Sequence, residues 1–210
     1  MSLFSLQDVN FKDIIHYPDI EIAEGYVTFI CGESGCGKST LLKLLNGVIS
    51  ADRGEILYAN KPIEKYDPIA LRREVVLCGQ SPFLFDGNIQ ENFEEYYKYR
   101  DLPKIIPEEA HKYLKICAAD FPLDAPCTTM SGGEKQRVFT AICLSLHPNV
   151  LLLDEPTSAL DDVTSNLMIT NIKAFCRDRK ISLIVVSHNK VLAESHADYT
   201  ILLTGGDRFE

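Results

Sequence analysis

The stretch Gly32-Glu33-Ser34-Gly35-Cys36-Gly37-Lys38-Ser39 decides the fold of this chain, because it fits the pattern G-x-x-x-x-G-K-[ST]. It follows the apolar run Tyr26–Cys31, which predicts a strand, and it opens Lys38–Gly47, whose leucines predict a buried helix. Glycines let the backbone wrap until its N–H groups point at phosphate oxygens, beside a helix N-terminus that favours anions. The stretch therefore predicts a phosphate-binding loop.

Each position of this loop has an expected task. Lys38 is expected to reach the β- and γ-phosphates of a nucleotide as a point charge, and Ser39 to offer its hydroxyl to Mg²⁺. The other positions expected to line the phosphates are Gly32, Glu33, Ser34, Gly35, Cys36, Gly37 and Thr40. A glycine-rich turn that binds no ligand is the alternative, and the strand–loop–helix context argues against it.

Two carboxylates follow a second apolar run, Val150–Leu153, which predicts a buried strand. In open α/β sheets, ligands bind at the carboxyl ends of the strands. We expect Asp154 to hold Mg²⁺ through water and Glu155 to accept a proton from an attacking water. Adjacent carboxylates repel each other, so a nearby divalent cation is a physical reason to place them together. The alternative is a solvated strand end that Asp-Glu-Pro merely terminates.

The rest of the chain alternates short apolar runs with helical patterns, which favours an α/β fold. Further strands are predicted at Arg53–Tyr58, Val75–Cys78 and Ile181–Val186. Residues 81–130 are richer in aromatics, proline and charge, with helical patterns near 88–99 and 107–118, and they predict a small helical subdomain. No linker is long enough to separate two domains, so we expect one domain over residues 1–210.

Composition limits the partners of the chain. Of the 210 residues, 46% are hydrophobic and 24% charged, as in soluble globular proteins. The net charge of −9 argues against a nucleic-acid partner, because phosphate contacts need clustered lysine and arginine. The sequence contains neither a bilayer-spanning apolar run nor a signal peptide, so we expect a cytoplasmic protein. The seven cysteines include no CxxC pair, and most lie in apolar stretches, which predicts buried, reduced thiols.

A third motif, Ser131-Gly132-Gly133-Glu134-Lys135-Gln136-Arg137, decides the subclass. With the other two motifs, in this order and spacing, nearly the whole chain resembles the ATP-binding-cassette (ABC) family of ATPases. Met130 stands where the family has leucine, and Glu134 where it has glutamine. The resemblance implies an α/β fold: a P-loop NTPase core with a mostly parallel sheet, an N-terminal antiparallel β portion and a small α-helical subdomain.

The resemblance also implies roles for single residues. Gln80 corresponds to the glutamine that contacts Mg²⁺ and the attacking water, and His188 to the histidine that hydrogen-bonds the γ-phosphate. Ser158–Asp161 corresponds to a segment that crosses a dimer interface. An aromatic near the N-terminus stacks on adenine in this family. Phe11 is the first choice and Tyr17 the second, although the stretch between Phe11 and the loop is short for the family.

The helix that Ser131, Gly132 and Gly133 open is a second anion site in the same chain. Because the chain has two anion sites but only one phosphate loop, the second anion site is expected to serve the nucleotide of another copy. The resemblance implies that two cassettes, either two copies or this chain and a homologous one, pack head to tail. Each ATP then lies between the loop of one chain and the Ser-Gly-Gly of the other.

Hydrolysis of ATP is expected to power a transporter whose membrane-spanning subunit is a separate chain. The alternative is a soluble cassette ATPase that acts in cofactor or cluster assembly. Aromatic and apolar side chains after Gln80 could dock a membrane partner or form the subdomain's own core: Phe83, Leu84, Phe85, Phe93, Tyr96, Tyr97 and Tyr99. The stretch from Gln80 to Ile89 and the small size resemble exporter-like cassettes, including small ATPases of bacterial metal (iron) exporters. Neither the cargo nor the direction of transport follows from these residues.

Overall fold

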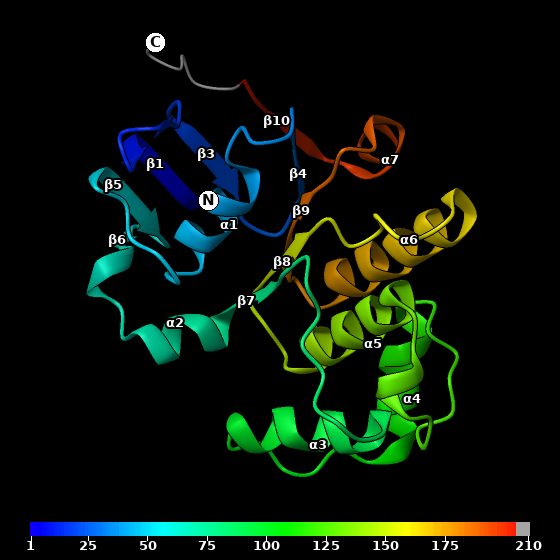
Figure 1. The fold of residues 1–210 in the computed structure, drawn as a ribbon. Helices are drawn as coiled ribbons and strands as arrows, with labels where there is room; N and C mark the ends of the chain where they lie inside the picture. The colour runs from blue at the N-terminus through cyan, green and yellow to red at the C-terminus, as the bar shows by residue number, and fades with distance from the viewer. Residues whose placement is uncertain (205–210) are drawn as a thin grey trace.

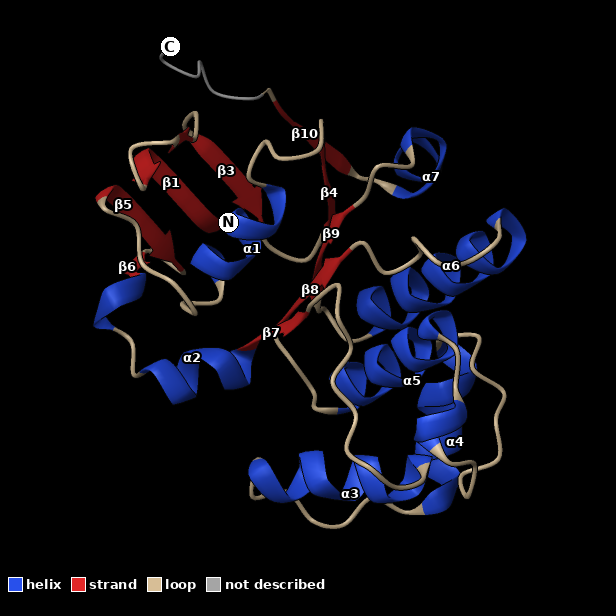
Figure 2. Cartoon of the chain, viewed as in Figure 1, coloured by secondary structure: helices blue, strands red, loops and turns tan. Residues whose placement is uncertain are grey.

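Two five-stranded sheets organise the computed structural model, which describes residues 1–204 (Figures 1 and 2). The first sheet is antiparallel, with the order β2-β1-β5-β6 and with β3 also paired to β1. Its strands are β1 (Ser2–Phe11), β2 (Ile15–His16), β3 (Ile20–Ala23), β5 (Arg53–Tyr58) and β6 (Lys61–Pro62). Strands β1, β2 and β3 precede the phosphate loop in the chain, and β5 and β6 follow the helix that this loop opens.

The second sheet is parallel throughout, in the order β10-β4-β9-β8-β7. Its strands are β4 (Val27–Gly32), β7 (Val75–Cys78), β8 (Val150–Asp154), β9 (Ser182–Val186) and β10 (Tyr199–Leu203). The helices are α1 (Lys38–Leu45), α2 (Pro68–Glu74), α3 (Ile89–Tyr99), α4 (Pro107–Ile116), α5 (Gly132–Ser145), α6 (Asp162–Asp178) and α7 (Lys190–His196), with short 3₁₀ turns η1 (Ile63–Lys65) and η2 (Cys127–Thr129). The predicted α/β fold, with its parallel core and N-terminal antiparallel sheet, is confirmed.

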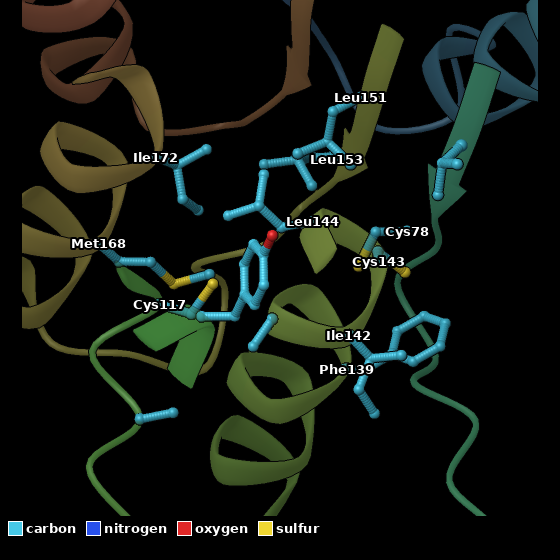
Figure 3. Packing of buried hydrophobic residues seen from close by; sticks show 14 of the residues in the cluster. Cys78, Cys117, Phe139, Ile142, Cys143, Leu144, Leu151, Leu153, Met168 and Ile172 are labelled. Carbon is cyan, nitrogen blue, oxygen red and sulfur yellow. The ribbon is translucent and has the colours of Figure 1, made fainter. Parts of the chain in front are cut away.

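The parallel sheet separates two hydrophobic clusters because successive side chains of a strand point to opposite faces. In β8, Leu151 and Leu153 belong to one cluster, whereas Val150 and Leu152 belong to the other. Helices α5 and α6 cover the first face, and α1 with the antiparallel sheet covers the second (Figures 1 and 3). The sequence shows continuous apolar runs for this reason, since β8 and β9 are buried on both faces.

Helices α3 and α4 lie beside α5, away from the antiparallel sheet (Figure 1). Phe93 and Tyr97 of α3 are buried in the cluster shared with α5, whereas Phe83 and Tyr99 are 60% and 67% exposed. The aromatic block after Gln80 therefore divides between core and surface. All seven cysteines are buried and unpaired, as predicted. Within residues 1–204, no helix is both long and apolar enough to pass through a bilayer.

Candidate functional site

The loop between β4 and α1 has a backbone that only glycine adopts readily. Gly35 and Gly37 have φ angles of 82° and 96°, in the left-handed region that side chains disfavour. A Cβ on Gly37 would lie 2.9 Å from both Ile15 and Tyr17. Gly37 caps α1 without a side-chain bond, so the first N–H groups of the helix remain directed into the loop. This arrangement fits a phosphate group, because it gathers backbone donors at a helix N-terminus.

The ammonium group of Lys38 lies inside the curl of the loop. Lys38 Nζ donates to the carbonyl oxygens of Gly32 at 2.9 Å and Glu33 at 2.7 Å, and the residue is 6% exposed. Cys36 Sγ lies 3.9 Å from the same nitrogen. The loop thus holds the Lys38 ammonium group among its own backbone carbonyl oxygens, and an anionic phosphate oxygen can replace them as the partner of that charge.

Oxygen donors from two elements meet beside the loop. Ser39 Oγ, in the first turn of α1, donates to Asp154 Oδ1 at the end of β8, at a distance of 3.0 Å. Gln80, which follows β7, lines the same hollow as Ser39. Hydroxyl, carboxylate and amide oxygens are the ligands that Mg²⁺ accepts beside a phosphate. The residues present therefore fit a magnesium ion.

Glu155 follows Asp154 and leaves the strand with a φ of 51°. This turn directs its carboxylate toward His188, whose Nε2 lies 3.1 Å from Glu155 Oε1 and whose backbone N–H reaches Oε2 at 3.4 Å. Burial raises the pKa of Glu155, and the neighbouring His188 and Lys38 lower it only in part. A carboxyl with a raised pKa that faces a hollow is suited to accept a proton.

Glu155, His188, Gln80 and Lys38 line one hollow of about 240 Å³ at the carboxyl edge of the parallel sheet. Other predicted positions on its wall are Ser34, Gly35, Gly37, Ser39 and Thr40. Asp154 reaches this wall through its hydrogen bond to Ser39. Ile15 of β2 also lines the hollow, and the motifs gave no signal for it.

The two aromatic candidates for adenine stacking have different surroundings. Tyr17 is 5% exposed, and its hydroxyl donates to the Gly37 carbonyl at 2.8 Å, so its ring packs beneath the loop. Phe11 is half-buried at the end of β1 and pairs in register with Ile15. Paired residues of an antiparallel ladder point to the same face, so Phe11 lies on the side where Ile15 meets the hollow. This geometry favours Phe11 over Tyr17.

The Ser-Gly-Gly motif lies on a separate surface. Ser131 caps α5, donating its N–H and hydroxyl to the Glu134 carboxylate at 2.8 and 2.7 Å. These bonds lower the pKa of Glu134. Ser131 and Gly132 are exposed, whereas Gly133 is buried against Ala159, because a Cβ on Gly133 would lie 3.0 Å from the Ala159 carbonyl oxygen. The wall of the Lys38 hollow does not include these residues.

The segment Ser158–Asp161 connects the two surfaces. Ser158 N–H donates to the carbonyl of Glu155 at 3.3 Å, so the segment turns directly after the carboxylate. Asp161 caps α6, accepting from the Thr164 N–H at 2.9 Å. This bond and the Thr164 hydroxyl lower the pKa of Asp161. The start of α5 and the end of β8 are thereby linked through one short segment.

Comparison with known proteins gives one consistent family. The family model described as ABC transporter matches residues 15–158. Protein STAR1 of Oryza sativa subsp. japonica is 34% identical over 200 residues, which are 95% of this chain and 58% of that protein. The "Probable iron export ATP-binding protein FetA" of Escherichia coli (strain K12) is 32% identical over 208 residues, 96% of this chain and 91% of that protein. This chain thus spans little more than half of STAR1 but nearly all of FetA.

A solved structure agrees with these relatives. The dimeric, post-hydrolysis ATP-binding cassette MJ0796, bound to ADP and Pi, superimposes with a TM-score of 0.84 at 25% identity, covering 97% of this chain and 95% of that one. The family match spans more than half of the chain and contains the phosphate loop and Asp154 with Glu155. The chain therefore belongs to the ABC transporter family and is an ATPase cassette of that family.

Proposed function

We propose that the chain hydrolyses ATP to power a transporter whose membrane-spanning part is a separate polypeptide. The observation that carries the proposal is the grouping of Lys38, Glu155 and His188 around one hollow at the carboxyl edge of the parallel sheet. On this proposal the chain works in the cytoplasm, held at the cytoplasmic face of the membrane by its partner. Its direction of transport and cargo depend on that partner.

The phosphates of ATP are bound by the loop. The backbone N–H groups of the loop and of the first turn of α1 contact phosphate oxygens, and Lys38 supplies a positive charge. The residues assigned to this task are Gly32, Glu33, Ser34, Gly35, Cys36, Gly37, Lys38, Ser39 and Thr40. Phe11 packs on the adenine ring, from the strand end that pairs with Ile15.

Ser39, Gln80 and Asp154 would hold Mg²⁺, which when bound would supply positive charge beside the phosphate oxygens. Glu155 accepts the proton of the attacking water, and its raised pKa brings its basicity closer to that task. His188, 3.1 Å from Glu155, is exposed enough to hydrogen-bond the γ-phosphate.

A second cassette closes the site. Ser131, Gly132 and Gly133 lie outside the Lys38 hollow of their own chain, so they serve the nucleotide of a partner cassette. The partner is a second copy or a homologous chain, packed head to tail. The start of α5 exposes Ser131 and Gly132 at the surface, and the N–H groups of a helix's first turn favour an anion there.

A membrane partner docks on the exposed aromatics of residues 81–130, which act as a helical subdomain. Phe83 and Tyr99 are exposed, and the half-buried Phe85 lies between them, 5.0 and 6.1 Å from their ring centroids. The Tyr96 hydroxyl donates to the Phe83 carbonyl at 2.8 Å, so the patch is held to α3. Aromatic side chains in such a patch anchor interfaces because they bury large areas at little entropic cost.

The substitution Glu155→Gln tests hydrolysis. We expect steady-state ATP turnover to fall about 100-fold or more, since a general base contributes about 10²–10⁴-fold, while ATP still binds. Glu194→Gln, the same change on the exposed face of α7, is the control and should leave turnover unchanged. Turnover of Glu155→Gln equal to that of the control would remove Glu155 from its assigned role.

A mixing experiment tests the head-to-tail pair. Lys38→Ala and Ser131→Arg chains are each expected to be inactive alone. In a mixed head-to-tail dimer both defects fall in one site and the other site is intact. Random mixing then restores about a quarter of wild-type turnover, because half of the dimers are mixed and each has one working site in two. If loop and Ser-Gly-Gly of one chain shared a site, mixing would restore nothing.

Copurification from solubilised membranes tests the transport partner. A tagged chain should retain a hydrophobic membrane subunit, and Phe83→Asp with Tyr99→Asp should release it. Ile69→Asp, a similarly exposed position on α2, is the matched control and should retain it. A purely soluble partner, retained by all variants, would contradict the transport proposal and support cofactor or cluster assembly.

A further inference from the structure

One polar side chain of α5 reaches the turn that carries Gln80. Gln136 is 6% exposed, and its Nε2 donates to the carbonyl oxygen of Gly79 at 3.3 Å and lies 3.8 Å from Cys78 Sγ. Gly79 directly precedes Gln80, and Gln136 lies on the helix that begins at the Ser-Gly-Gly motif. A single side chain thus connects the start of α5 with the edge of the Lys38 hollow.

The turn at Gly79 has little else to hold it. A Cβ built on Gly79 would meet no atom within 4 Å, so the space on that side of the residue is open. Among residues 1–204, the amide of Gln136 makes the one hydrogen bond found for Gly79, and Gln80 has none. Cys78, one residue earlier, is fully buried. The position of Gln80 therefore depends on a fixed strand end and on this amide.

Stability does not explain the choice of glutamine at position 136. Gln136 Oε1 is buried and finds no hydrogen-bond partner in the described part of the chain. A buried polar atom without a partner destabilises a fold, and an apolar side chain of the same shape would avoid that loss. What a polar residue at position 136 provides, and an apolar one would not, is the hydrogen bond to Gly79.

The neighbouring polar residue on the same face has a different contact. Thr140, one turn along α5, donates to the Gln136 carbonyl at 2.7 Å and lies 3.4 Å from Cys78 Sγ. Cys143 lies a further turn along and also faces Cys78 (Figure 3). Both residues contact the buried strand, and neither bonds to Gly79. Gln136 alone on this face extends past the strand to the turn.

We propose that Gln136 is a positioning residue for ATP hydrolysis, which fixes Gly79 and so directs Gln80 into the hollow beside Glu155. The proposal rests on the role given above to Gln80. The same hydrogen bond connects the Ser-Gly-Gly surface with the Lys38 hollow of one chain. Helix α5, which on the proposed function presents Ser131 to a partner, also holds the turn that carries Gln80.

The test replaces Gln136 by methionine, which keeps the volume of the side chain and removes its donor. We expect kcat for ATP hydrolysis to fall about tenfold, the upper part of what one uncharged hydrogen bond contributes. The dissociation constant for ADP, measured by calorimetry, should change less than about twofold, because Gln80 acts on the reacting water and Mg²⁺ rather than on the nucleotide alone. The melting temperature should not fall, and amide exchange at residues 79–81 should accelerate.

Thr140→Val is the control on the same helix face, since it loses the hydroxyl's contacts with Cys78 Sγ and with the Gln136 backbone carbonyl but leaves the Gln136 side chain and its bond to Gly79 in place. It should leave kcat and the exchange of residues 79–81 unchanged. A fall of kcat in Thr140→Val equal to that in Gln136→Met would show that any disturbance of α5 has this effect, and would overturn the proposal. So would an unchanged kcat in Gln136→Met.

A double-mutant cycle with Gln80→Ala separates this proposal from the assigned role of Gln80. If Gln136 acts through Gln80, Gln136→Met lowers kcat in the wild-type background and not in Gln80→Ala. An equal further loss in the Gln80→Ala background overturns the positioning role while the role of Gln80 stands. If Gln80→Ala itself retains full turnover, both the role of Gln80 and the proposal fall.

Discussion

The hydroxyl of Tyr17 should stabilise the phosphate loop from below, and Tyr17→Phe tests this. The hydroxyl donates to the Gly37 carbonyl at 2.8 Å, in a side chain that is 5% exposed. The same carbonyl also accepts the first helical bond, from the Leu41 N–H at 2.8 Å. The substitution therefore leaves that oxygen with one partner, and the larger penalty of an unpaired buried group does not arise. The expected loss is the net value of one hydrogen bond, about 1 kcal/mol.

For a chain of this length, about 1 kcal/mol lowers the melting temperature by roughly 2–4 °C. Thermal unfolding followed by circular dichroism measures this shift. Tyr26→Phe is the control, since Tyr26 is 47% exposed and its ring packs edge-on against the ring of Tyr199. Burial raises the pKa of Tyr17, so the phenol stays protonated and the difference should persist in mildly alkaline buffer. Equal melting temperatures for the two variants would refute the argument.

Three further predictions concern the same site. Because burial raises the pKa of Glu155, turnover should fall on acidification at a pH above the ordinary glutamate range. For the same reason Glu155→Gln should melt at a higher temperature than wild type at neutral pH, and this gain should vanish as the pH falls to about 4.3, where unfolded glutamate protonates. The opposite trend in either measurement would contradict the desolvation argument. Lys38→Ala should weaken ADP binding roughly 10–150-fold in calorimetry, the value of one charged hydrogen bond, and unaltered affinity would exclude a phosphate contact. Gly37→Ala combines a left-handed φ of 96° with contacts of 2.9 Å to Ile15 and Tyr17, so it should lose roughly 2 kcal/mol or more and melt about 4–8 °C lower in the same thermal assay; wild-type melting would mean that the loop relaxes freely.

Strands with clear sequence boundaries could be predicted closely. Arg53–Tyr58 and Val75–Cys78 are the observed β5 and β7, because apolar runs there end at turn residues or glycine. The helix α2 was missed, since its seven residues bury only Leu71 and so carry no periodic pattern. The long β1 was also unclear, because a bulge near Asp8, where φ is 51°, breaks the alternation of buried and exposed residues.

The motif residues of the site could be located because their spacing encodes local geometry. A strand, a glycine turn and a helix start place Lys38 and Ser39, and a strand end places Asp154 and Glu155. Contacts between residues far apart in the chain produce no such pattern in the sequence. Gln136 and Gly79 are 57 residues apart, and neither the period of α5 nor the end of β7 predicts that they touch.

The fold assigns the loop and the Ser-Gly-Gly helix to different cores. Helix α1 packs in the cluster beneath the antiparallel sheet, and α5 packs in the cluster on the opposite face of the parallel sheet. Apolar packing alone would let each helix move with its own cluster, independently of the other helix. Two connections at the carboxyl edge of the parallel sheet oppose such independent movement. They are the Gln136–Gly79 hydrogen bond and the segment from Glu155 to Leu160, which packs on Gly133. Both connections begin at residues next to the Lys38 hollow, so a change of contacts in that hollow reaches the surface that we propose for a second cassette.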